Sequence, residues 1–287
     1  MNLVINTGEY LFRLGNISPR SVLADVQYIY GSEATQSSLD TPVDFEVSLN
    51  QAALLRRFIR PQVTFSTDQQ TPFKPMPKSQ AYPVLEWGMN WCIAAYDFNR
   101  FIVHAAVLEK NGKAVMFPAA PGSGKSTLTA FLSQNGWNLF SDEMTIIDFK
   151  TNLANPMYRP VSLKNESIDL VKNWFPDSVF SNTALNTQKG DVALFKAIDW
   201  DTFSKLQKTE IVGVIFPKYD ANIEQTTIYT MNQIQGFEQL ATNAFNYNIT
   251  GLSGFETVSE VIKSSKQFEI HYNDVADVND FLIEEII

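Results

Sequence analysis

The sequence predicts an α/β protein whose central unit is a strand, a glycine-rich loop, a helix and a second strand, in that order. The apolar run at residues 114–117 indicates the first strand, and the apolar positions within residues 126–134 fall on one side of a helix. A second apolar run follows at residues 137–140. With 287 residues, 45% of them hydrophobic, the chain is long enough for one large domain or two ordinary ones.

The charge and the cysteine and histidine content exclude several classes of function. A formal net charge of −9 argues against nucleic acid as a partner, because wrapping a polyphosphate backbone needs clustered Lys and Arg. Cys92 is the only cysteine, and His104 and His271 are the only histidines, so a disulfide and a Cys- or His-rich metal site are excluded. Neither a leader peptide nor an apolar run long enough to span a bilayer is recognisable, so we expect a cytoplasmic protein without a membrane partner.

The first part of the chain, residues 1–83, is expected to form a smaller α+β region. Residues 22–30 and 43–49 alternate between apolar and polar side chains, which predicts strands. The sequence then becomes polar between residues 68 and 83 and holds several closely spaced prolines. Because proline interrupts regular structure and restricts the residue before it, we expect the boundary of this region here.

The second part, residues 84–287, is expected to form the larger domain. Apolar residues three and four positions apart predict a helix at residues 84–95. Asn111-Gly112 predicts a tight hairpin turn between strands at residues 102–108 and 114–117, and Gly136 suits a left-handed cap after the loop helix. Further strands are predicted at residues 211–216, 227–231 and 268–272, and further helices at residues 256–265 and 278–287.

The loop between the central strand and helix has the composition of a phosphate-binding loop. It reads Pro121-Gly122-Ser123-Gly124-Lys125-Ser126-Thr127. The glycines let backbone N–H groups point inward at phosphate oxygens, and the N-terminus of the following helix adds partial positive charge. Lys125 would reach the β- and γ-phosphates of ATP, and the Ser126 hydroxyl would bind Mg²⁺. The pattern departs from the usual one at its first glycine, which is Ala119 here.

An acidic pair and a histidine are the next candidates for chemistry. Asp142 follows Lys125 by only 17 residues, so the next strand delivers Asp142 and Glu143, and this short spacing favours a kinase over ATPases of the transporter or helicase type. Asp142 is the candidate base for an acceptor hydroxyl and Glu143 the candidate Mg²⁺ ligand. His104, on the first strand of the hairpin that feeds the loop, is placed to approach the γ-phosphate or Asp142, although a histidine in an apolar strand is commonly a core residue.

Six segments together resemble the HprK-related kinase A family. They are residues 86–91, the His-Ala-Ala-Val-Leu-Glu run at 104–109, the loop at 121–127, the run 136–143 that ends in Ser-Asp-Glu, the Arg-Pro-Val-Ser-Leu-Lys-Asn run at 159–165, and residues 187–190. The resemblance implies the fold of HPr kinase/phosphorylase, a serine kinase whose catalytic domain is similar to that of phosphoenolpyruvate carboxykinase. It also implies an active site made of His104, Lys125, Ser126, Asp142 and Glu143, with Asp142 matching the base and Glu143 the metal-side acid.

The loop and the resemblance together predict an ATP- and Mg²⁺-dependent kinase that phosphorylates a hydroxyl, with a serine of a peptide or protein as the expected acceptor. Arg159, Lys164 and Lys189 are further candidate contacts to phosphate or substrate. Residues 1–83 would then recognise the acceptor or build a homo-oligomer.

Three alternatives stay open. The first is a nucleotide-gated binding or assembly module without transferase activity, and the second is a kinase of a small metabolite such as free serine. The third is a GTPase, because residues 217–220 faintly resemble a guanine-reading Asn/Thr-Lys-x-Asp motif. Pro217 departs from that motif, and the chain holds no Asp-x-x-Gly sequence to sense a γ-phosphate, so the GTPase is disfavoured.

Overall fold

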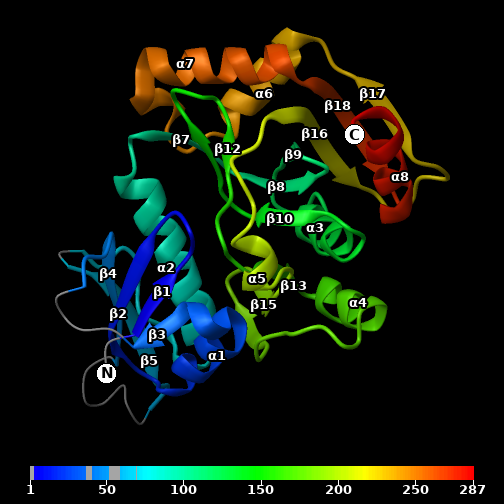
Figure 1. The fold of residues 1–287 in the computed structure, drawn as a ribbon. Coiled ribbons are helices and arrows are strands. Elements are labelled where there is room, and N and C mark those ends of the chain that lie inside the picture. The colour runs from blue at the N-terminus through cyan, green and yellow to red at the C-terminus, as the bar shows by residue number, and fades with distance from the viewer. Residues whose placement is uncertain (1–2, 37–40, 52–58, 69) are drawn as a thin grey trace. The chain divides into compact units, whose positions relative to one another are not determined.

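The computed structural model describes residues 3–36, 41–51, 59–68 and 70–287 (Figure 1). Its contacts divide the chain into two compact units. The first unit contains Met1–Tyr96 and Ser162–Lys196, and the second contains Asp97–Val161 and Ala197–Ile287. The division therefore differs from a single boundary near residue 83, since a later segment of the chain returns to the first unit.

The first unit contains a six-stranded sheet in the order β3-β1-β2-β4-β5-β6. Its strands are β1 (Leu3–Asn6), β2 (Leu11–Ile17), β3 (Ala34–Gln36), β4 (Phe45–Gln51), β5 (Gln62–Thr67) and β6 (Met76–Pro77). The pair β2 and β4 is parallel, and the other neighbours are antiparallel. Ser162–Lys196 adds α4 (Glu166–Trp174) and most of a three-stranded sheet, which is formed by β13 (Val161–Lys164), β15 (Gly190–Phe195) and β14 (Ala184–Thr187).

Helix α2 (Ala81–Tyr96), preceded by a 3₁₀ turn η3 (Lys78–Gln80), packs on β4 and β5 and confirms the helix predicted at residues 84–95. Gly88 faces the Phe65 ring so closely that an added Cβ would overlap it. Glu86 of the same helix is buried, and its two carboxylate oxygens lie 3.1 and 3.0 Å from the Tyr30 hydroxyl, which donates to them. The absence of a side chain at position 88 therefore sets how closely this helix approaches the sheet.

One predicted strand of this unit is wrong and the other is confirmed. Residues 43–49 largely form β4, but residues 22–30 lie in helix α1 (Ser21–Tyr30), which a 3₁₀ turn η1 (Gly31–Glu33) follows. The buried positions of α1 are Val22, Val26, Ile29 and Tyr30. Their spacing of three and four residues is that of one helical face, and this longer period outweighed the local alternation of apolar and polar residues.

The second unit is built on a six-stranded sheet in the order β10-β8-β9-β16-β18-β17. Its strands are β8 (Ala105–Lys110), β9 (Lys113–Pro118), β10 (Asn138–Ser141), β16 (Ile211–Tyr219), β17 (Thr227–Thr230) and β18 (Lys266–Tyr272). These ranges confirm the strands predicted at residues 114–117, 137–140, 211–216, 227–231 and 268–272. Strands β9, β16 and β18 are parallel, so their carboxyl ends meet at one edge of the sheet.

Helices cover both faces of this sheet. They are α3 (Lys125–Gln134), α5 (Trp200–Phe203), α6 (Gln233–Thr242), α7 (Tyr247–Ser264) and α8 (Val275–Glu285), and α3, α7 and α8 confirm three predictions. Phe268 of β18 meets Phe281 of α8, whereas its neighbour Gln267 donates to the Ile262 carbonyl of α7 at 2.8 Å. Because successive residues of a strand point to opposite faces, α7 and α8 lie on opposite sides. Among the described residues, no helix is both long enough and apolar enough to cross a bilayer.

The strand predicted at residues 102–108 is divided at His104. Residues before it form β7 (Arg100–Val103), which joins β11 (Thr145–Asp148) and β12 (Ala154–Asn155) in a separate three-stranded sheet. The His104 backbone N–H donates to the Asn243 carbonyl at 2.7 Å and so takes no part in the hydrogen bonding of either sheet. The chain passes from one sheet to the other at this residue. The hairpin after β8 is as predicted, with positive φ at Asn111 (56°) and Gly112 (75°).

Candidate active site

The predicted phosphate loop joins β9 to α3 at the edge of the sheet where the parallel strands end. Gly122 and Gly124 have φ values of 89° and 82°, and Gly124 is the N-cap of α3. A Cβ on Gly122 would meet no atom within 4 Å, whereas on Gly124 it would lie 2.5 Å from the Tyr272 hydroxyl oxygen. Both positions need the conformational freedom of glycine, and position 124 has no room for a side chain as well.

Three predicted site residues meet at this loop: Lys125, Ser126 and Asp142. The Lys125 ammonium donates to the Asp142 backbone oxygen and lies 3.4 Å from the carboxylate oxygen Oδ1. The Ser126 hydroxyl donates to the other carboxylate oxygen, Oδ2, at 3.0 Å. The lysine and aspartate side chains are only 9% and 1% exposed. Because a buried carboxylate is costly without compensation, the ammonium and the hydroxyl stabilise Asp142 in this position.

The Ser126 and Asp142 oxygens lie close enough together that they could hold a magnesium ion as two neighbouring ligands. Octahedral Mg²⁺ binds oxygen at about 2.0–2.1 Å, so ligands at right angles lie roughly 2.9 Å apart. The observed separation of 3.0 Å between Ser126 Oγ and Asp142 Oδ2 matches this value. No group of three or more His, Cys, Asp or Glu side chains suited to a metal occurs among the described residues.

Glu143 and His104 lie in the same unit as the loop. Glu143 follows Asp142 in the bend between β10 and β11 and is more exposed than its neighbour. His104, between β7 and β8, is bonded through its backbone to Asn243, and its ring centroid lies 5.6 Å from that of Phe245. These contacts fix the position of the His104 backbone and one side of its ring.

The three basic candidates are divided between the units. Arg159 belongs to the second unit and is 7% exposed. It lies two residues after Met157, whose N–H donates to the Phe140 carbonyl of β10 at 2.9 Å. Lys164 and Lys189 belong to the first unit. The Lys189 ammonium lies 4.9 Å from the centroid of the Trp87 ring, a cation–π contact within that unit.

Two tyrosines beside the loop were not predicted. The N–H of Tyr219, at the end of β16, donates to the Ser123 carbonyl at 3.0 Å, and the Tyr219 and Tyr272 rings pack edge to face at 5.7 Å. Burial raises the pKa of the Tyr272 phenol, and Tyr219 raises it further, so the phenol stays protonated and neutral at neutral pH. The signal in the sequence is limited to the place of each tyrosine, at the end of the predicted strand 268–272 or shortly after the predicted strand 211–216, and only the parallel pairing of β16 and β18 places both at the loop.

The segment that faintly resembled a guanine-reading motif also lies at this edge. Its lysine, Lys218, forms an ion pair with Glu269 at 2.8 Å. Its aspartate, Asp220, accepts hydrogen bonds from the N–H and the side-chain amide of Asn222 at 2.9 and 3.0 Å. Both side chains are thus engaged within the protein, which further disfavours a guanine-specific site.

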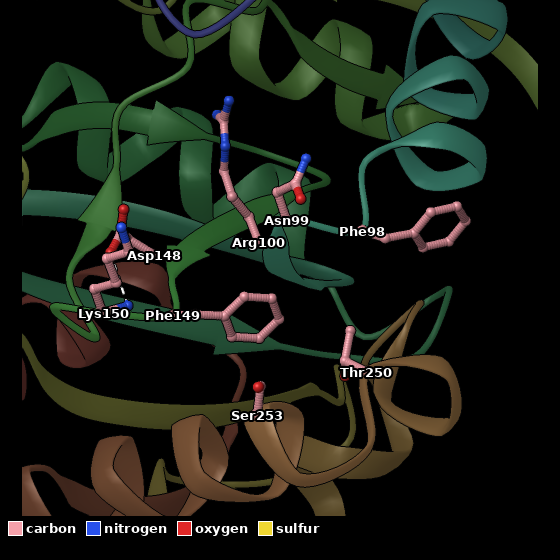
Figure 2. A pocket seen from close by; sticks show the side chains of 8 residues that line it. All are labelled: Phe98, Asn99, Arg100, Asp148, Phe149, Lys150, Thr250 and Ser253. Carbon is pink, nitrogen blue, oxygen red and sulfur yellow. Dashed lines mark hydrogen bonds between the residues drawn. The ribbon is translucent and has the colours of Figure 1, made fainter.

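A pocket of about 510 Å³ lies elsewhere in the second unit (Figure 2). It is lined by Phe98, Asn99, Arg100, Asp148, Phe149, Lys150, Thr250 and Ser253. Arg100 forms an ion pair with Asp97 at 3.4 Å, and Asp148 accepts from the Lys150 N–H at 2.9 Å, the dashed line in Figure 2. Its lining includes no predicted site residue, so the pocket and the loop are separate features.

The second unit is therefore of mixed α/β class and places a lysine, a serine and an aspartate together at a glycine-rich loop. In comparisons with known proteins, no family model and no curated protein matches this chain.

Proposed function

We propose that this protein is an ATP- and Mg²⁺-dependent kinase that transfers the γ-phosphoryl group to a hydroxyl, with a serine of a peptide or protein as acceptor. The observation that carries the proposal is the contact of one carboxylate, that of Asp142, with both Lys125 and Ser126. Phosphoryl transfer needs a cation that neutralises phosphate charge and oxygen ligands that bind the metal. Lys125 and Ser126, at the start of α3, and the neighbouring Asp142 are groups of these kinds.

The loop supplies the phosphate contacts in this proposal. Backbone N–H groups around Gly122 and Gly124 and the N-terminus of α3 bind the phosphate oxygens. Lys125 exchanges its contact with Asp142 for the β- and γ-phosphates, which neutralises charge that builds up on the γ-phosphoryl oxygens. Ser126 and Asp142 would hold Mg²⁺, which would neutralise phosphate charge and orient the triphosphate.

The geometry favours the opposite division of roles between the two acids from that expected from the sequence. Asp142 is buried, and its carboxylate contacts the Lys125 ammonium and the Ser126 hydroxyl, the loop side chains proposed to bind phosphate and metal. We therefore assign Asp142 to the metal and Glu143, which is more exposed, to the acceptor. Glu143 takes the proton of the acceptor hydroxyl while the acceptor oxygen forms a bond to the γ-phosphorus. The bond from that phosphorus to the bridging oxygen breaks, and ADP leaves with the electron pair.

The acceptor class rests on the resemblance of the sequence to the HprK-related kinase A family, and Arg159 of the second unit stays a candidate contact to phosphate or substrate. The test is incubation of the full chain with Mg²⁺ and γ-labelled ATP, together with serine-containing peptides, extract proteins or free serine. Label on a peptide or protein serine supports the proposal. Label on free serine alone would instead favour a metabolite kinase, and label found only as inorganic phosphate would favour a nucleotide-gated module.

The matched control is a pair of lysine variants. Lys125→Ala should abolish transfer, whereas Lys263→Ala, which removes an exposed lysine paired with Glu260 on α7, should leave it unchanged. Loss of transfer in both variants would mean that the activity depends on overall charge or stability and not on the loop.

A further inference from the structure

Two buried hydroxyl groups flank Gly124 of the phosphate loop, and neither has a hydrogen-bond partner within the described part of the chain. They are the Tyr272 phenol and the Ser123 hydroxyl. Tyr272 is only 1% exposed, and the Ser123 oxygen is shielded as well. A hydroxyl removed from water without a replacement bond is costly, so most buried hydroxyls in proteins have a partner.

Backbone hydrogen bonds hold both residues at the same strand ends. The Tyr219 N–H donates to the Ser123 carbonyl at 3.0 Å, and the next N–H, that of Asp220, donates to the Tyr272 carbonyl at 3.0 Å. The end of β16 therefore links the loop to the end of β18. The backbone positions of Ser123 and Tyr272 relative to each other therefore follow from the sheet.

The Tyr272 phenol is directed at the loop backbone. A Cβ built on Gly124 would lie 2.5 Å from the phenol oxygen, so the oxygen touches the loop at the residue that begins α3. A glycine at this position is what allows the phenol to come so close. Packing alone does not account for the hydroxyl, because a phenylalanine ring would fill the same space and would leave no unpaired polar atom.

We propose that Tyr272 and Ser123 donate hydrogen bonds to the phosphate oxygens of a triphosphate bound in the loop. The inference rests on the proposed function and adds two side-chain donors to the backbone N–H groups, Lys125 and the metal site. Both are neutral donors, so they add no charge repulsion with the phosphates. Because their hydrogen bonds form only with the ligand, their contribution goes to binding and not to folding.

The test compares ligand affinity with the stability of the free protein. Tyr272→Phe keeps the ring and removes only the hydroxyl, and Ser123→Ala does the same at the loop. Binding of magnesium tripolyphosphate and of magnesium ATP to the full chain is measured by calorimetry, and Tm is measured without ligand. We expect each variant to bind both ligands about 10- to 100-fold more weakly, the effect of one lost hydrogen bond to a charged group. We also expect the Tm of the free protein to be unchanged or raised.

Tripolyphosphate lacks a base and a sugar, so a loss seen with it locates the two hydroxyls at the phosphates. Tyr28→Phe, on the exposed face of α1 in the other unit, is the matched control and should change neither quantity. Unchanged affinity in Tyr272→Phe and Ser123→Ala would overturn the inference. A lowered Tm of the free variants would do so too, because it would mean that the hydroxyls already have partners in the protein.

Failure of the inference is distinguishable from failure of the proposed function. If the unmodified chain binds neither ATP nor tripolyphosphate, the proposed function and this inference are both wrong. If it binds both and Lys125→Ala weakens binding, while Tyr272→Phe and Ser123→Ala bind as tightly as the unmodified chain, only the inference is wrong.

Discussion

The Ser126 hydroxyl of the loop helix and the Asp142 carboxylate at the end of β10 form a hydrogen bond of 3.0 Å. Strand β10, which Asp142 directly follows, is separated from the loop strand β9 by β8, yet both end at the same edge, because β10 and β9 are each antiparallel to β8. Asp142 therefore lies beside the first turn of α3, where its carboxylate contacts both Lys125 and Ser126. The predictions about chemistry depend on this contact.

Replacement of Lys125 by methionine should weaken ATP binding about 10- to 100-fold, because hydrogen bonds to charged groups contribute roughly 1.5–3 kcal/mol. Methionine keeps most of the buried stem volume, so the change tests the ammonium and not the packing. It also leaves Asp142 without its cation, so the free variant should unfold at a lower temperature. Calorimetric titration with ATP and thermal unfolding measure the two effects. An unchanged ATP affinity would remove Lys125 from the phosphate site.

Glu143→Gln and Asp142→Asn should separate the base from the metal-side acid. Glu143→Gln should lower the rate of transfer about 100-fold or more and leave the affinity for magnesium ATP nearly unchanged. Asp142→Asn should instead raise the Mg²⁺ concentration needed for half-maximal activity, because it removes a charged oxygen ligand. Initial rates over a Mg²⁺ series measure both. If Asp142→Asn loses transfer at all Mg²⁺ concentrations while Glu143→Gln stays active, the roles are reversed and Asp142 is the base.

The sequence predicts the strand, loop and helix around Lys125 because these signals are local. The glycines, the lysine and the helical spacing of the following apolar residues lie within about twenty positions of one another. Prediction from the sequence fails at residues 22–30, where an alternating pattern and a helical pattern overlap. It also fails at His104, where a backbone hydrogen bond to the distant Asn243 interrupts the predicted strand. Neither Tyr272 nor the return of Ser162–Lys196 to the first unit has a local signal, since both depend on pairing between distant segments.

Alanine at Gly124 should destabilise the protein more than alanine at Gly122. Both residues have positive φ, so each substitution costs about 1 kcal/mol in backbone strain. The Cβ at position 122 would enter open space, but at position 124 it would overlap the Tyr272 hydroxyl and Tyr219 Cβ at 2.5 and 2.8 Å. We expect an additional loss of roughly 1–3 kcal/mol at position 124 from this overlap. Urea unfolding of the two variants measures the difference, and equal losses would mean that the tyrosines move aside.

Glu269 should stabilise the fold at neutral pH and lose this contribution in acid. Burial raises the pKa of its carboxyl, but hydrogen bonds and charge from Lys218 and His271, at 2.8 and 2.7 Å, outweigh burial and bring the net pKa below 4.5. A carboxyl with a lowered pKa in the folded state binds protons more tightly in the unfolded chain. Its stabilisation is therefore fully present above about pH 4.5 and is lost as the pH falls through the lower folded pKa.

The pH range of this loss can be measured with Glu269→Gln, which keeps the shape of the side chain and removes its charge. At pH 7 the variant should be about 0.5–1 kcal/mol less stable than the unmodified chain, since Lys218 is largely exposed and its ion pair is screened by solvent. Urea unfolding at pH 7, 5 and 3 should show this difference shrink at the lowest pH. Glu260→Gln, in an exposed pair with Lys263, is the control and should change stability by only a few tenths of a kcal/mol. A difference for Glu269→Gln that persists unchanged at pH 3 would mean that the carboxylate charge is not what stabilises this edge of the sheet.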